Sequence, residues 1–370
     1  MQKLYKIEIF DNAFNLVGHS AILEPEVVYD YISMSTTSIA CLDEMPNIRQ
    51  YQLAHITDND GTVVFQGIVY GFVQEKDALM QVTVKPLLSL MDRSFSTEGY
   101  ITEYDTVEGW IAYFLKTVYQ GTEQIPASYA GIKIRAVTQT RIAEARDPEM
   151  AAIMDMYDYA VTALQAYGIV VKAAFDPQAK TFTFEIGVNS DAQVTVEADR
   201  PNIIAKTFNM DGDGEKYNVV QLFFKDDTGQ TTGRWYALNT EGGLADTTPP
   251  DYHLEDIEPP LMMTYADLGS GYNTTDKYPP DSVWLEKARE VLKPAADSQE
   301  ISLTVSAEDR LVRIDMMDMG RAIRILHAGS VYESKLTGVL LSNGVKTLTF
   351  GFARTDLTSI LTFQRRGKTW

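Results

Sequence analysis

The sequence has 370 residues and a formal net charge of −19, from 51 acidic and 32 basic residues. With 45% hydrophobic and 11% aromatic residues the chain can bury real cores, which excludes a disordered protein, and its length predicts two or three domains. The acidic balance argues against a protein that grips nucleic acid by neutralising phosphates. The negative charge is compatible with a protein that forms a wall along which DNA passes without binding. The simpler interpretation is that the charge maintains solubility.

The sequence also limits which targeting signals, membrane spans and cysteine-based sites are expected. The first twelve residues alternate apolar and charged side chains, so we expect no secretory signal. No apolar run approaches the ~18 residues of a membrane span. Cys41 is the only cysteine, which excludes an intrachain disulfide and a cysteine-based zinc site.

Residues 1–95 have the pattern of a small antiparallel barrel or sandwich. In the first strand, Tyr5, Ile7 and Ile9 alternate with charged residues, which indicates one buried face. Asp58–Gly61 is a strong turn signal. Further strands are expected at residues 16–22, 27–34 and 49–57.

Residues 96–195 predict an α+β domain. Asp105 and Glu108 have capping-box spacing, and a helix with an apolar stripe follows as far as Val118. A second helix is expected over Pro148–Tyr167, ending at Gly168. Strands over 169–175 and 181–188 complete a small sheet on which the helices pack.

From Asp199 the chain returns to β structure, with a hairpin formed by residues 218–224 and 232–238. The proline-rich stretch Asn239–Pro280 is long for a connection and is expected to be a surface excursion. A short helix over Val283–Leu292 and a strand over Ile301–Val305 follow.

One stretch appears twice, as His55–Asp92 and as Leu326–Thr362. Each copy begins at a turn that ends in glycine and continues through a strand to a second glycine. A second hairpin strand follows, and each copy ends in a similar run of mostly apolar residues, its closing phrase. The opening glycine and the closing phrase are 26 positions apart in the first copy and 28 in the second. The repeat indicates two related β-domains with an insertion between them, although a chance likeness of two hairpins is the alternative. The matched positions are Gly61 and Gly329, Gly71 and Gly338, and Leu87–Met91 and Leu357–Leu361.

The predicted fold class is therefore α+β and mainly β, with two related antiparallel barrel-like domains around an α+β insertion. The expected domains are an N-terminal barrel-like domain (1–95), the insertion (96–195), a hairpin region with the long excursion and a helix (196–300), and a C-terminal barrel-like domain (301–370).

Catalytic and metal-binding patterns are sparse. His19, His55, His253 and His327 form no metal-binding spacing, although a site assembled by folding stays open. Asn209–Gly214 resembles the start of a calcium loop, but Val220 stands where a bidentate glutamate belongs, so a glycine-rich turn fits better. His253–Glu258 is more simply an acidic loop than a metal site.

Nucleophile and nucleotide motifs are equally weak. Cys41 lacks a catalytic signature, and Gly269–Gly271 lacks the strand–turn–helix frame of a nucleophile elbow. Neither type of glycine-rich phosphate loop occurs. Asp155 and Asp158 are three apart, a spacing also typical of a solvated helix face. We therefore assign no catalytic, cofactor-binding or metal residue and no cofactor, and the interaction surfaces stay unassigned.

The order of parts resembles the central hub proteins of phage tail tips and baseplates, which are similar to those of contractile injection machines. The insertion resembles that of siphophage tail-associated hub proteins, and some relatives of this kind are described as tail endopeptidases. The resemblance covers nearly the whole chain, and each motif is weak alone. It rests on Tyr167–Val171, Phe175-Asp176, Lys180–Phe184, Tyr217–Val220 and Phe350–Leu357.

The resemblance implies a homotrimer, in which two barrels from each chain form a ring of six pseudo-equivalent domains around a channel. Implied partners are a distal tail protein or tube ring, a tape measure protein, and spike, fibre or receptor-binding proteins. DNA would be met only in passage and no membrane insertion is expected. The implied location is the virion tail tip, after synthesis in the host cytoplasm, and we expect no cell-wall-degrading module after the second β-domain.

Two other function classes stay open. A tail-tip peptidoglycan hydrolase or peptidase would need a carboxylate or nucleophile site that no motif shows, so an enzyme is not expected. A glycan- or receptor-binding β-protein would need saturable binding by the isolated chain.

Overall fold

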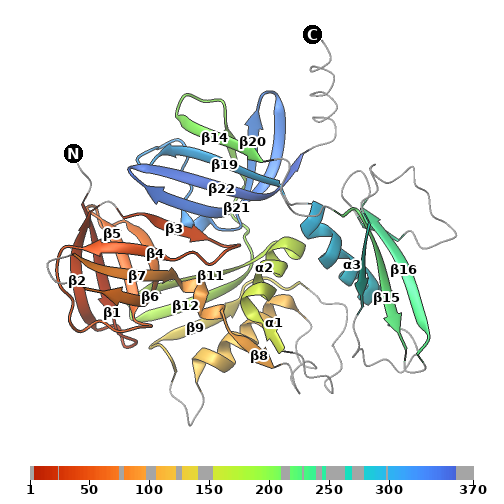
Figure 1. The fold of residues 1–370 in the computed structure, drawn as a ribbon, viewed down its shortest axis with the longest axis horizontal. Helices are drawn as coiled ribbons and strands as arrows, with labels where there is room; N and C mark the ends of the chain where they lie inside the picture. The colour runs from red at the N-terminus through yellow and green to blue at the C-terminus, as the bar shows by residue number, and fades with distance from the viewer. Residues whose placement is uncertain are drawn as a thin grey trace.

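A computed structural model shows the architecture in Figure 1. It describes residues 4–23, 25–74, 79–96, 106–121, 127–140, 153–209, 217–226, 229–238, 244–246, 263–268, 279–296 and 299–355. Within these residues the protein is mainly β, with few helices. The described part of the chain has no helix long and apolar enough to cross a membrane.

The N-terminal unit is a closed barrel of six antiparallel strands in the order β1-β2-β4-β7-β6-β5. Alternation of apolar and polar residues places one face of each strand inside, as for Ile7, Ile9, Phe65 and Val82, all fully buried. Residues Thr37–Cys41 form a strand that the sequence did not predict. The strands are β1 (Leu4–Phe10), β2 (Leu16–Leu23), β4 (Thr37–Cys41), β5 (Leu53–Asp58), β6 (Val63–Val73) and β7 (Met80–Pro86).

The α+β unit has a three-stranded sheet of order β11-β12-β9, where β9 runs parallel to β12. The buried face includes Phe182, Phe184 and Ile186. Two helices pack against this unit, and a two-stranded ribbon adjoins it. The elements are α1 (Val107–Leu115), α2 (Met156–Tyr167), β8 (Ser94–Ser96), β9 (Ile132–Ala136), β10 (Ile153–Asp155), β11 (Ile169–Asp176) and β12 (Thr181–Val188).

Both helix starts differ from the sequence prediction. Thr106, one residue after the expected cap, is the N-cap of α1, and its side chain accepts a hydrogen bond from Gly109 N at 3.1 Å. Glu108 is instead buried and accepts hydrogen bonds from Thr138 and Thr140. The prediction of helix over 153–155 is wrong, because these residues pair with β8 and Asp155 caps α2.

The second β-unit is a half-barrel with the sheet order β13-β20-β21-β22-β19-β14. Among the described strands, β13 and β14 are not paired with each other, so the sheet stays open there. Its strands come from both sides of residue 300, which is where the sequence places a domain boundary. The strands are β13 (Val194–Glu197), β14 (Ile203–Asn209), β19 (Gln299–Ser306), β20 (Ala322–His327), β21 (Ser330–Ser342) and β22 (Val345–Thr355).

A fourth unit follows β14 and precedes β19 in the chain. Its four-stranded sheet has the order β17-β16-β15-β18, and helix α3 packs on it with the fully buried Trp284. Two short strands from the predicted proline-rich excursion join this sheet, and the rest of that excursion lies outside the described residues except for Leu268, Pro279 and Pro280. The elements are β15 (Val219–Lys225), β16 (Thr231–Leu238), β17 (Leu244–Asp246), β18 (Met263–Asp267) and α3 (Asp281–Ala296).

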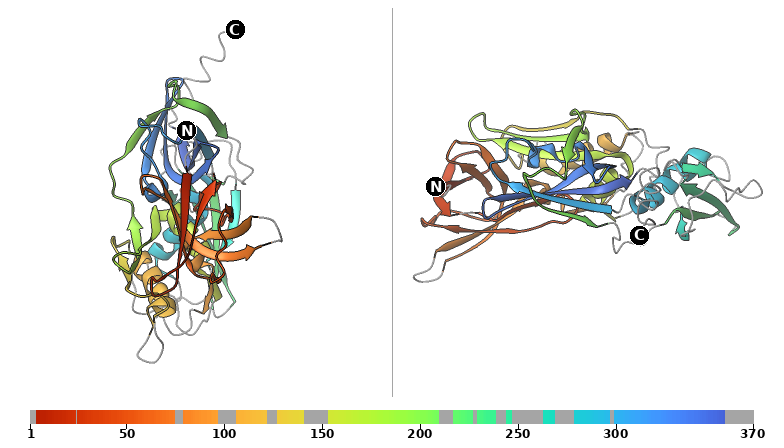
Figure 2. Two further views of the ribbon diagram at one scale, coloured as in Figure 1. Left: turned by 90° about the vertical axis from the view of Figure 1, so that its left-hand side faces the viewer. Right: turned by 90° about the horizontal axis from the view of Figure 1, so that it is seen from above.

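The four units form an elongated body (Figures 1 and 2). The closed barrel lies at one end and the β15–α3 unit at the other, with the α+β unit and the half-barrel between them. The predicted fold class is confirmed: two β-barrel-like units are separated in the chain by an α+β insertion.

Candidate functional site: two copies of one barrel and the strand between them

The two β-units repeat one strand plan. Strands β1, β2, β4, β5, β6 and β7 of the closed barrel correspond in chain order to β13, β14, β19, β20, β21 and β22. Their neighbours also correspond, except that β1 pairs with β2 whereas the described strands β13 and β14 are not paired, and that β13 runs parallel to β20 whereas β1 runs antiparallel to β5. Two hairpins meeting by chance would not reproduce six strands in one order. The repeat seen in the sequence is therefore part of a larger duplication, of which the sequence shows only the hairpins.

The two hairpins share one register shift, although β21 has a further shift between Glu333 and Lys335 that β6 lacks. β6 shifts its pairing with β7 between Val69 and Gly71, and β21 shifts its pairing with β22 between Leu336 and Gly338. The glycines matched in the sequence therefore follow the same bulge in both copies. We call residues at matching register positions counterparts. The second copy's closing phrase at 357–361 lies outside the described residues.

The turn into each hairpin is also duplicated. Tyr51 N donates to Val69 O and Val69 N to Gln52 O; Gly320 N donates to Leu336 O and Leu336 N to Arg321 O. Tyr51 and Gly320 share a positive φ, 65° and 73°. A positive φ is uncommon for a residue other than glycine. Because Tyr51 has a positive φ like that of Gly320, the two turns share a backbone conformation although their side chains differ.

One strand of the first barrel leaves it and joins the second. Strand β3 (Val27–Asp30) pairs antiparallel with residues 338–341 of β21, and Tyr31 N donates to Thr337 O at 2.8 Å. Val27 and Tyr29 are buried at this junction. β3 thus covers the part of β21 that extends beyond β20, so a segment between β2 and β4 of the closed barrel belongs to the sheet of the half-barrel.

Tyr31 ties this junction to the α+β unit. Its side chain is fully buried, and its hydroxyl accepts a hydrogen bond from Val171 N of β11 at 2.8 Å. Tyr157 of α2 donates its hydroxyl to Tyr31 O at 3.0 Å. Burial raises the pKa of Tyr157 and Tyr31, so both stay neutral donors or acceptors. Three units therefore meet at one residue.

A second tie runs from the closed barrel to β11. Gln66 of β6 donates from Nε2 to Phe175 O at 2.6 Å, and its Oε1 accepts from Phe175 N at 3.1 Å. The amide thus completes the backbone pairing of one residue, as a neighbouring strand would. His55, paired with Gln66 across the sheet, packs against Phe175 with ring centroids 5.6 Å apart.

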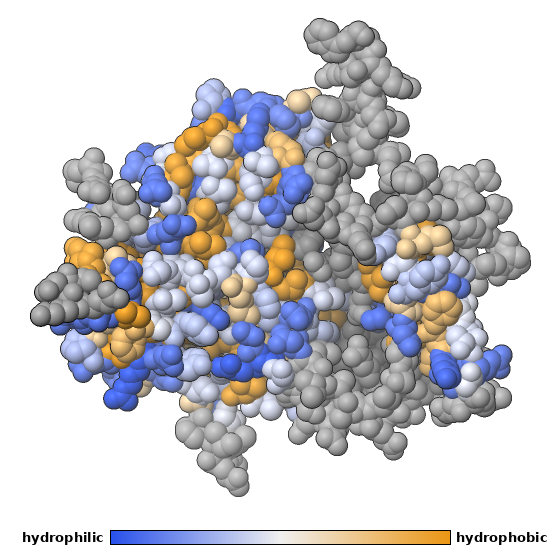
Figure 3. Space-filling view, in the orientation of Figure 1, coloured by the Kyte–Doolittle hydropathy of each residue, from blue (hydrophilic) through white to orange (hydrophobic). Residues whose placement is uncertain are grey.

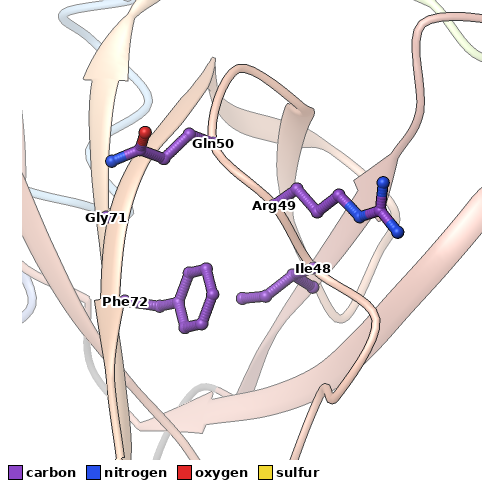
Figure 4. A pocket seen from close by; sticks show the side chains of 5 residues that line it. All are labelled: Ile48, Arg49, Gln50, Gly71 and Phe72. Carbon is purple, nitrogen blue, oxygen red and sulfur yellow. The ribbon is translucent and has the colours of Figure 1, made fainter.

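Residues 337–341 of β21 are the part that β3 covers, and the counterpart edge of β6 has no strand beside it in the described structure. Beside it lies a hollow of about 570 Å³ that is lined by Ile48, Arg49, Gln50, Gly71 and Phe72 (Figure 4). Phe72 points from β6 toward the loop that carries Ile48. In the half-barrel, the counterparts of Gln50 and Phe72 are Met319 and Val339, and both are buried.

A known tail protein shares this architecture. The chain aligns over 94% of its length with 96% of the tail protein from Neisseria meningitidis MC58, with a TM-score of 0.56 and 13% identity. The 43 kDa tail protein of prophage MuSo2 from Shewanella oneidensis aligns with 95% of this chain over 98% of its own, at a TM-score of 0.53 and 10% identity. The chain has the fold of phage tail proteins.

A third similar structure supports the same conclusion. The prophage tail protein gp18 from Listeria monocytogenes EGD-e aligns over 98% of both chains, with a TM-score of 0.51 and 9% identity. No family model matches the sequence, and no curated protein does either. The resemblance predicted from the sequence is confirmed at the level of the fold, which almost the whole chain shares.

Within this tail-protein fold, the sequence candidates for chemistry are scattered. Cys41 is buried in the barrel, and burial raises the pKa of its thiol to about 12, so it is not poised as a nucleophile. Asp155 is engaged as the cap of α2. In the part of the chain that is described, no three His, Cys, Asp or Glu residues are grouped to hold a metal. Residues 210–214, 253–258 and 269–271 lie outside that part.

The histidines are not brought together. His19 is exposed on β2, His55 lies under Phe175, and His253 falls outside the described residues. His327 joins a polar cluster that the sequence did not indicate, with Asp199 accepting from Ala328 N at 2.8 Å and contacting Lys206 and His327. These hydrogen bonds, first of all that from Ala328, hold the pKa of Asp199 well below its usual range. The cluster joins the chain after β13 to the β20–β21 turn, which is a structural role.

Proposed function

We propose that this chain is a structural component of a phage or phage-like tail tip or baseplate. In this proposal it forms a homotrimeric hub that joins the tail tube to the tip and encloses the channel for DNA. The observation that supports it is the duplicated barrel in a fold shared with phage tail proteins. Two barrels per chain and three chains make six similar units, so a three-fold assembly can meet a six-fold tube.

The partners follow from this arrangement. The ring of barrels would contact a distal tail protein or tube ring and the tape measure protein. The α+β unit and the β15–α3 unit would contact spike, fibre or receptor-binding proteins in the virion. A net charge of −19 suits a channel wall that repels DNA, so we expect polar or acidic residues at the lumen.

The test is the assembly itself. Mass photometry and negative-stain imaging of the purified chain at micromolar concentration, alone and with its tail partners, should show trimers whose class averages have six similar lobes around a central opening. A chain that stays monomeric under all these conditions would contradict the proposal, as would a strongly basic lumen.

A further inference from the structure

The two barrels differ at one strand edge, and the difference identifies an interface. On β21, residues 337–341 are covered by β3. On β6, the counterpart residues 70–73 have no strand partner on that side among the described residues. β6 pairs with β5 up to Ile68 and with the Tyr51 turn at Val69, and beyond this point its outer edge is open.

Burial shows how much this edge differs between the copies. Thr337 and Val339 are 1% and 6% exposed, whereas their counterparts Tyr70 and Phe72 are 47% and 44% exposed. Val73 and Leu79 on the same hairpin are also exposed. The free edge therefore exposes large aromatic side chains at two positions where the covered edge has smaller, buried ones.

The space around the counterpart glycines Gly71 and Gly338 shows the same difference between the two edges. A Cβ added to Gly338 would lie 3.2 Å from Thr349 and 3.6 Å from Tyr29 O of β3. A Cβ added to Gly71 would have nothing within 4 Å. The open space beside Gly71 continues into the hollow lined by Ile48 and Phe72 (Figure 4). This is the space that β3 fills in the other copy.

We propose that the Tyr70–Val73 edge of β6 accepts a strand from the half-barrel side of a second copy of this chain, in the way that β21 accepts β3. The inference deepens the proposed function and rests on it. In a ring of alternating barrels, the junction inside one chain and the junction between chains are pseudo-equivalent. The first is β3 on β21, so the second is a strand on β6.

The position of the units favours another copy as the source of that strand. β3 follows β2 in the closed barrel, and the first described strand after β14 in the half-barrel is β15. In the same subunit β15 lies at the end of the body opposite the closed barrel, away from β6 (Figures 1 and 2). The β6–β7 hairpin, in contrast, projects from the side of the body (Figure 2).

The half-barrel also exposes an apolar side chain on its open edge strand. β14 has mostly exposed residues, and its Ile204 is among the most exposed apolar side chains. Apolar surface is visible on both the closed barrel and the half-barrel (Figure 3). Pairing of an edge strand would bury the apolar side chains and satisfy the free backbone groups together.

The experiment uses the full chain and a double substitution, Phe72→Asp with Val73→Asp. Both side chains are exposed, so we expect the variant to keep the wild-type circular dichroism spectrum and melting temperature at low concentration. Placing two charges in the interface should weaken self-association at least ~100-fold in sedimentation velocity. The matched control is Val63→Asp, at the paired end of the same strand and 45% exposed, which should associate like the wild type.

Hydrogen exchange tests the strand pairing directly. Amides of residues 70–73 should exchange more slowly in the assembled wild type than in the diluted monomer, and those of Val63 and Val64 should change little. If the wild type assembles and the double variant assembles equally well, the interface lies elsewhere and the hub proposal stands. A wild type that never assembles overturns both.

Discussion

The closed barrel and the half-barrel keep the same hairpin and differ in what closes it. β5–β7 and β20–β22 share one bulge and the entry turn, and each copy has one register shift of its own. In the first barrel β1 pairs antiparallel with β5, and in the second β13 pairs parallel with β20 and leaves a gap to β14. The hairpin is therefore common to both copies, and the flanking strands decide whether the sheet closes.

The largest expected effect comes from a glycine that only one barrel needs. A Cβ on Gly67 would lie 2.2 Å from Lys85 O, whereas its counterpart Ser334 has room for a hydroxyl that donates to Gly351 O at 2.7 Å. We expect Gly67→Ala to destabilise the protein by about 3 kcal/mol, because a backbone oxygen must move. Urea denaturation measures this.

Gly71→Ala is the matched control for that substitution, since its Cβ meets nothing within 4 Å. It should change the free energy of unfolding by less than about 0.5 kcal/mol. Equal effects at Gly67 and Gly71 would mean that the close contact with Lys85 does not govern the closed barrel.

A second substitution loosens the strand that joins the barrels. Tyr31→Phe removes the hydroxyl that accepts from the buried Val171 N, and an unsatisfied buried N–H costs about 2 kcal/mol. Hydrogen exchange should become faster at Val171 and at residues 338–341 of β21. Tyr70→Phe, on the exposed edge, is the control and should leave both the exchange and the stability as they are.

The two barrels also differ in what their counterpart residues Gln66 and Glu333 bind. Gln66 is bonded to Phe175, whereas its counterpart Glu333 forms an exposed ion pair with Arg324. Gln66→Ala should cost about 1 to 2 kcal/mol, because two backbone groups lose their partner. Glu333→Ala should cost less than about 1 kcal/mol, since exposed ion pairs contribute little. Thermal denaturation of both variants compares them, and a larger cost at Glu333 would contradict the assignment.

The smallest effect is a pH dependence that only the closed barrel should show. Burial lowers the pKa of His55 below its usual 6.5, and neither ring nitrogen has a hydrogen-bond partner in the described structure. Above about pH 6.5 both states are neutral and His55 has no effect. As the pH falls below this value, the unfolded state binds the proton first, so stability decreases until the pKa of the folded state is reached.

His55→Phe should therefore flatten the stability curve below pH 6.5 and change little at pH 7.5. Chemical denaturation at a series of pH values measures this. His19→Gln is the control, because His19 is exposed and the substitution should leave the slope unchanged. A slope that survives in His55→Phe would show that another group carries it.

The sequence by itself determined the fold class, the repeated hairpins and two strands of the α+β unit, β11 and β12, but not β8, β9 or β10. These are local features, since alternating apolar residues and glycine turns are visible within a few positions. The helix starts were less well determined: Thr106 and Asp155 compete with neighbouring polar residues for the capping role, and contacts with β8 and with Thr138 and Thr140 decide between them.

Only the tertiary structure decided which edges pair. β3 has four residues, and nothing in them distinguishes β21 from a neighbour in its own barrel. β13 and β14 join β19–β22 across the intervening residues 210–298, and Gln66 meets Phe175 from 109 positions away. Such choices depend on long-range burial and on backbone groups that need partners, which no local pattern contains.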